Sequence, residues 1–147
     1  MTPTNFTTQF SVANSATEVF HAINNVRGWW QGEIEGPTAQ LNDEFIYRMK
    51  EIHYSKQKIE ACIPDQKVVW LVTDSNLNFT QNKSEWTGTK IIFEITEINN
   101  QTQLCFTHAG LVPAMECYGG CSSAWEKLIQ ESLFGLITTG KGANVFG

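Results

Sequence analysis

The stretch WEKLIQESLFGLI, residues 125–137, decides the fold of this chain. Its apolar side chains recur at intervals of three and four residues, and the residues between them are mostly charged or polar. That spacing gives a helix one apolar face and one face for water. We therefore predict a long amphipathic C-terminal helix whose buried stripe consists of Trp125, Leu128, Ile129, Leu133, Leu136 and Ile137.

The ends of this helix differ in how clearly they are marked. Gly140 and Gly142 follow the last periodic residue, and glycine readily adopts the left-handed conformation that ends helices. On the other side, a glycine pair interrupts the pattern, so the helix can begin anywhere from Met115 to Ser123.

Upstream of the helix, between Leu41 and Ala109, the period changes to two, which is typical of half-buried strands. Pro64-Asp65 and Asn99-Asn100 are pairs that favour tight turns between antiparallel strands. The inward faces of the predicted strands carry Phe45, Tyr47, Met49, Val68, Trp70, Val72, Ile91, Phe93, Ile95, Leu104, Phe106 and His108.

Residues 74–88 are harder to assign. Leu77 and Phe79 indicate one more strand, and Trp86-Thr-Gly88 indicates a turn after it. The sequence leaves the structure of this segment open.

The N-terminal part adds a strand and a short helix. Phe6, Phe10 and Val12 share one face of a strand, and Ser15 with Glu18 has the spacing of a capping box that begins a helix. The helices are thus separate from a block of antiparallel strands, which is typical of the α+β class.

Length and composition are those of one compact domain, for which we take the range 1–147. The 147 residues include 41% hydrophobic residues, five Trp and nine Phe, enough for a core rich in large rings. The net charge is −5 and no basic run is present, so nucleic acid is not an expected partner.

We expect a cytoplasmic protein with no membrane partner, because neither a signal-peptide pattern nor an apolar run of about 18 residues is present. In that compartment cysteines are kept as thiols. We expect this state for Cys62, Cys105, Cys117 and Cys121.

Several segments together resemble the START-like superfamily, also called SRPBCC or birch-pollen-allergen-like. They are Ser15-Ala-Thr-Glu-Val-Phe20, Trp29-Trp30, Ile63-Pro-Asp-Gln-Lys-Val-Val-Trp70 and Thr107-His-Ala-Gly-Leu111. Within the superfamily the chain is similar to the branch of heat-shock chaperone ATPase activators. It departs from the usual Gly-Trp opening of the last helix, with Tyr118-Gly-Gly-Cys121 in that place. The resemblance implies a helix-grip fold, a curved antiparallel sheet wrapped around the C-terminal helix with an elongated cavity between them.

The ring-bearing residues are the candidate ligand-binding set, because pockets are lined mainly by apolar and aromatic side chains with few polar groups. Core packing is the alternative for each ring taken singly. With one polar residue added, the set is Trp30, Phe45, Tyr47, Trp70, Phe93, Phe106, His108 and Trp125.

Acid-base chemistry has few candidates. We expect His21 and His53 to be solvated, and His108 to face inward at the end of its strand. There His108 can act on a ligand, with Glu116 as the other candidate for that role, or it can simply hydrogen-bond a backbone carbonyl or Glu116 and fix the loop. His108 and Glu116 are the catalytic candidates, and Tyr118 is a further possible proton donor at the cavity mouth.

A metal site is not expected. Cys117 and Cys121 are four residues apart, but a structural zinc site needs four ligands. No phosphate-binding loop or nucleophile triad is present, so no cofactor is expected.

These observations favour a non-catalytic protein that binds a small hydrophobic or aromatic molecule between the sheet and the C-terminal helix. Two alternatives stay open. One is a cyclase- or hydratase-type enzyme using the same cavity, and the other is a chaperone co-regulator acting through its surface.

Overall fold

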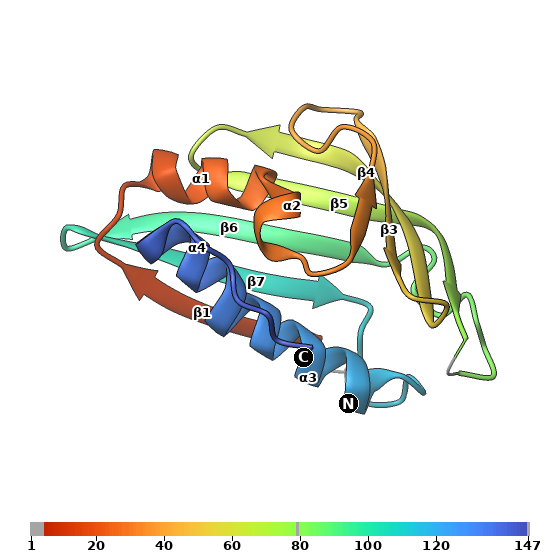
Figure 1. Ribbon diagram of the computed structural model, residues 1–147. Coiled ribbons are helices and arrows are strands. Elements are labelled where there is room, and N and C mark those ends of the chain that lie inside the picture. Colours follow the sequence, from red (N-terminus) through yellow and green to blue (C-terminus); the bar gives the residue numbers. More distant parts are fainter. Residues whose placement is uncertain (1–4, 79, 147) are drawn as a thin grey trace.

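The chain forms an antiparallel sheet with its helices packed on one face. The computed structural model describes residues 5–78 and 80–146. Seven strands form one sheet in the order β1-β7-β6-β5-β4-β3-β2. The C-terminal helix runs across β7 and β1, and the N-terminal helices lie beside it (Figure 1). The predicted α+β helix-grip fold is confirmed.

The strands pair mostly with their neighbours in sequence, and β1 closes against β7. They are β1 Phe6–Val12, β2 Glu33–Glu35, β3 Glu44–Met49, β4 His53–Ile63, β5 Lys67–Leu77, β6 Lys90–Ile98 and β7 Gln101–Ala109.

The C-terminal helix is one continuous rod with three segments, α3 Tyr118–Lys127, η1 Leu128–Leu133 and α4 Phe134–Thr139. Its middle segment is π-helical. Gly140 ends it with a φ of 85°, as the sequence predicted. The predicted apolar stripe is buried except at Leu136, which is half-buried.

The prediction of a separate strand around Leu77 was wrong. Leu77 is the last residue of β5, which continues without interruption from Lys67 and pairs with β4 along both of their lengths. Two register shifts in this pairing, at Lys56/Gln57 and Ile59/Ala61, are bulges, which bend strands and increase their twist. Phe79 lies outside the described residues. The turn at residues 86–88 is confirmed.

The N-terminal helix α1 (Ala16–Asn24) begins with the predicted capping box. The backbone N–H of Glu18 donates to Ser15 Oγ at 3.1 Å, and the N–H of Ser15 donates to the Glu18 carboxylate at 3.2 Å. A second short helix, α2 (Val26–Trp29), follows and delivers Trp29 and Trp30 into the core.

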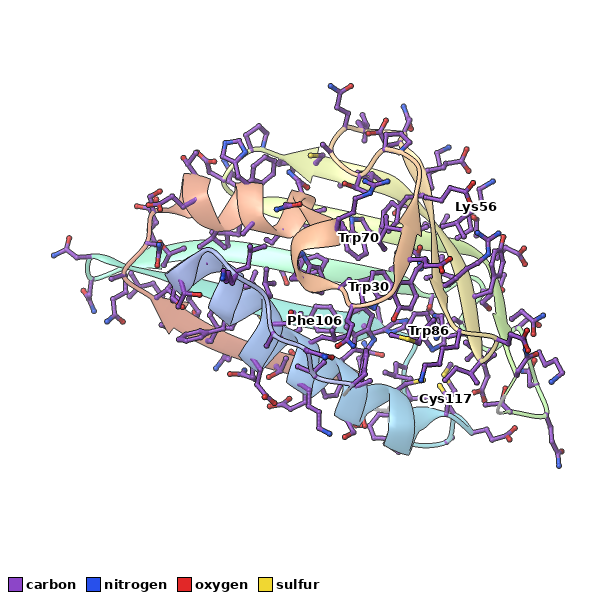
Figure 2. All side chains as sticks on the ribbon, in the orientation of Figure 1. Trp30, Lys56, Trp70, Trp86, Phe106 and Cys117 are labelled. Atoms are coloured by element: carbon purple, nitrogen blue, oxygen red, sulfur yellow. The ribbon has the colours of Figure 1, made fainter. Side chains whose placement is uncertain are left out.

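The core is a single cluster of buried apolar residues dominated by rings. Figure 2 shows Phe106 beside the C-terminal helix, Trp30 and Trp70 near α2, and Trp86 and Cys117 toward the start of the C-terminal helix. Over the described ranges, no helix is both long and apolar enough to cross a membrane.

Candidate ligand pocket

A cavity of about 410 Å³ lies between the β3–β4 hairpin and the first turns of α3. Six of its fourteen lining residues carry rings, and the apolar residues Met49, Ile52, Ala124 and Leu128 lie between them. The ring-bearing residues on the wall are Trp30, Tyr47, His53, Trp86, Trp125 and Phe146.

Three of the predicted ligand-binding residues, Trp30, Tyr47 and Trp125, line this cavity. The other five lie behind the wall: Phe45, Trp70, Phe93, Phe106 and His108 are almost fully buried and are not part of the lining.

The rings of the wall support one another through stacking. Trp30 lies parallel to Tyr47 with centroids 3.9 Å apart, and 5.1 Å from Trp125 at a tilt. Trp125 in turn stacks on Trp86 at 5.8 Å. Such pairs stabilise beyond their buried area, so the wall is a rigid, flat-sided surface.

Tyr47 is fixed at both ends of its side chain. Its hydroxyl donates to the Gln31 carbonyl at 2.6 Å, and burial raises the pKa of the phenol. Gly32, with a φ of 147°, lies against the ring, where a Cβ would be 2.5 Å from the Tyr47 ring edge. Only glycine fits that close approach without displacing the ring.

The prediction that His53 is solvated was wrong, whereas His21 is exposed as predicted. His53 is half-buried and lines the pocket, edge-on to Tyr47 at 5.0 Å and to Trp86 at 4.6 Å. Burial lowers the pKa of His53 to about 4, so the imidazole is neutral near pH 7.

His53 also begins a polar row on the inner face of β4. Its Nε2 lies 3.1 Å from Ser55 Oγ, and the same oxygen accepts a hydrogen bond from Gln57 Nε2. Ser55 and Gln57 are fully buried. The inner face of this strand is therefore polar over three consecutive inward positions.

His108 faces inward as predicted, but both of its ring nitrogens are occupied. Thr89 Oγ1 donates to the Trp86 carbonyl at 2.6 Å, so it accepts from His108 Nε2–H at 2.8 Å. Nδ1 then accepts from Trp125 Nε1–H at 3.0 Å. Burial, followed by the nearby imidazole of His53, lowers the pKa of His108 to about 3.

Glu116 lies outside the cavity lining, on the exposed loop before α3. Its carboxylate accepts from the backbone N–H of Gln81 at 3.0 Å, and its own N–H donates to Glu85 at 2.7 Å. The two loops are thus joined here. Glu116 does not contact His108 by a hydrogen bond.

Cys117 and Cys121 are buried thiols, and Cys121 reaches the pocket wall. A hydrogen bond from the Cys117 thiol lowers the pKa of Cys121, and the same bond raises the pKa of Cys117. Within the two described ranges, no group of three or more His, Cys, Asp or Glu side chains has the geometry of a metal site.

Sequence reasoning missed Trp86, His53 and Lys50 as wall residues. Trp86 lies in an irregular turn, where no periodicity signals burial. The available signal was its size, since a Trp in a polar loop usually finds a buried place.

A curved antiparallel sheet that holds a long C-terminal helix over a ring-lined cavity is a helix-grip fold. No protein-family model matches this sequence, and no curated protein is similar enough to match it.

Solved structures do match, and they show the same fold. The chain is similar to the Aha1 dimer from Colwellia psychrerythraea, with 22% identity, 95% of this chain and 99% of that chain covered, and a TM-score of 0.75. It is also similar to SSP2350 from Staphylococcus saprophyticus, with 14% identity, 96% of each chain covered and a TM-score of 0.68. DynU16, from the dynemicin biosynthetic locus, has 14% identity and a TM-score of 0.66, over 94% of this chain and 48% of that one.

Proposed function

We propose that the protein binds a small hydrophobic or aromatic molecule, without transforming it, in the cavity between the β3–β4 hairpin and α3. The carrying observation is the cavity of about 410 Å³ with stacked rings on its walls. Ligand pockets have volumes of roughly 300–1,000 Å³ and are lined mostly by apolar and aromatic side chains. The ligand-binding set becomes Trp30, Tyr47, His53, Trp86 and Trp125.

The positions of His108 and Glu116 argue against the enzyme alternative that used these two residues. A general acid or base must reach the reacting group within hydrogen-bond distance. His108 is fully buried with both nitrogens bonded, and the carboxylate of Glu116 is bonded to a backbone N–H of a neighbouring loop. Neither side chain lines the cavity.

The chaperone co-regulator hypothesis keeps one supporting observation, the likeness in fold to the Aha1 dimer over nearly the whole chain. A surface function of that kind does not need the cavity. Binding to a purified heat-shock chaperone should then be unchanged by a substitution that fills the pocket.

Two neighbouring glycines in the first turn of α3 offer a matched test. Gly120 lines the pocket and Gly119 does not, and a Cβ at either position would meet no atom within 4 Å apart from its chain neighbours and the backbone of its own helix. Gly120→Leu should place its side chain in the cavity, whereas Gly119→Leu adds the same side chain outside it. Both remove a helical glycine, so either should raise stability, by up to about 1 kcal/mol.

The readout is the fluorescence of N-phenylnaphthylamine, an uncharged aromatic dye that brightens in apolar sites. We expect saturable binding to the unaltered protein and to Gly119→Leu, and at least about tenfold weaker binding to Gly120→Leu, a loss of roughly 1.4 kcal/mol. The proposal fails if the dye does not bind the unaltered protein, or if the two variants bind it equally well.

A further inference from the structure

We propose that the ligand is an acid: a flat apolar or aromatic molecule whose anionic group lies beside Lys50 at the mouth of the pocket. This inference rests on the proposed function and specifies the class of ligand for the same site. It is carried by the charges on the wall and by the position of Lys50.

Charge on the pocket wall is of one sign. Lys50 is the one charged side chain among the described residues of the lining, which includes neither Asp nor Glu. The whole chain has a net charge of −5, with 15 acidic against 10 basic residues, so a wall without a carboxylate departs from the rest of the molecule. A bound anion would therefore meet no Asp or Glu on this wall and one positive side chain, Lys50.

The position of Lys50 is conformationally unusual. It lies in the turn between β3 and β4 with a φ of 51°. Over the described ranges, the other non-glycine residues with positive φ are Asn42, Asp65, Asn99 and Asn100. Asn and Asp adopt this conformation at low cost, whereas lysine does so rarely. The turn chemistry itself does not call for a lysine.

The ammonium group of Lys50 is also available. In the described part of the chain, Lys50 forms no ion pair, whereas Arg48, Lys56 and Lys90 are each paired with a glutamate. Its side chain is exposed while contributing to the wall, which is the geometry of a cation at a pocket mouth.

His53 adds a neutral imidazole to the same wall. Ser55 Oγ already accepts from Gln57, and its hydroxyl proton has no hydrogen-bond acceptor in the described ranges other than His53 Nε2. The proton therefore lies on the Ser55 side of that bond, which leaves the imidazole as the Nδ1–H tautomer. The imidazole is therefore a neutral group on the wall and adds no negative charge beside the ligand.

The test compares two dyes that differ by one anionic group. Anilinonaphthalene sulfonate carries a sulfonate, and N-phenylnaphthylamine is the same ring system without it. The charge is removed by Lys50→Asn, which keeps a residue suited to positive φ, and reversed by Lys50→Glu. The control Lys127→Gln removes an equal charge from an exposed position of α3 outside the lining.

We expect Lys50→Asn to weaken the binding of the anionic dye by about twofold to fivefold, which is the range for a solvent-exposed ion pair. Lys50→Glu should weaken that binding further. The uncharged dye should bind all variants equally, and Lys127→Gln should bind both dyes like the unaltered protein. The effect on the anionic dye should shrink as salt is added.

Failure of this inference differs from failure of the proposed function. If the uncharged dye binds but Lys50→Asn and Lys127→Gln affect the anionic dye equally, the pocket stands and the acid specificity is refuted. If the uncharged dye does not bind the unaltered protein, the proposed function fails, and the inference fails with it.

Discussion

Lowering the pH from 7 to 5 should destabilise the protein strongly through His108. This imidazole is fully buried, accepts a hydrogen bond from Trp125 at Nδ1, and donates to Thr89 from Nε2. Protonation of Nδ1 would place two donors face to face inside the core. The pKa of His108 is lowered to about 3 by burial and, second, by His53.

The sign of the effect follows from proton linkage. Between about pH 3 and pH 6.5, the unfolded chain binds a proton at His108 and the folded chain does not. The contribution of neutral His108 to stability is therefore complete above pH 6.5 and is lost as the pH falls toward 3. From 6.5 to 5 is 1.5 pH units at about 1.36 kcal/mol each, so the loss at pH 5 is about 2 kcal/mol.

His53 acts in the same direction, because burial lowers its pKa to about 4. Its contribution over the same interval is also about 2 kcal/mol, so the two histidines together should cost up to about 4 kcal/mol at pH 5. That is a large part of the stability of a typical domain.

The assay is urea unfolding at pH 7, 6 and 5, monitored by tryptophan fluorescence, for the unaltered protein, His108→Gln and His21→Gln. His108→Gln cannot titrate, so it should be less stable at pH 7 but lose about 2 kcal/mol less on acidification. His21 is exposed, and His21→Gln should follow the unaltered protein. A stability independent of pH over this interval, or an equal loss in His108→Gln, would refute the reasoning.

Three further predictions concern single contacts. Ser15→Ala removes the hydrogen bond that caps α1 and should lower the free energy of unfolding by about 1 kcal/mol; no change in the urea midpoint would contradict the capping role. Tyr47→Phe keeps the stack on Trp30 and loses the bond to the Gln31 carbonyl, so it should cost about 1 kcal/mol, whereas Tyr47→Ala should also abolish dye binding. Cys121 lies on the pocket wall, so bound N-phenylnaphthylamine should slow its reaction with iodoacetamide; mass spectrometry of the modified peptide measures the rate, and equal rates with and without dye would place Cys121 away from the ligand.

Much of the fold could be predicted because the elements obey simple periods. The stripe from Trp125 to Ile137 could only be helical, and the alternation from Ile91 to Ile95 could only be a strand buried on one face. The end of the helix at Gly140 followed from backbone preference alone.

The site was less predictable, because its decisive residues break those periods. On β4 the inward positions are His53, Ser55 and Gln57, which are polar like the lysines on the outer face. The alternation of apolar and polar residues that marks an inner face is therefore missing from this part of the sequence. Trp86 lies in a turn, where the burial of a side chain depends on which other elements pack against it and not on a local sequence period.

His108 shows that a sequence pattern can predict which face of a strand a side chain lies on without predicting how deeply it is buried. Alternation places it on the inner face of β7, and it is there. Its ring lies edge-on against Trp86 at 4.7 Å, and its Nδ1 holds Trp125, so the two Trp rings stand between it and the cavity. A buried polar residue with both partners satisfied is costly to disturb. His108 therefore orients the rings that form the wall, and a variant at this position should change the shape of the pocket without removing any group that contacts the ligand.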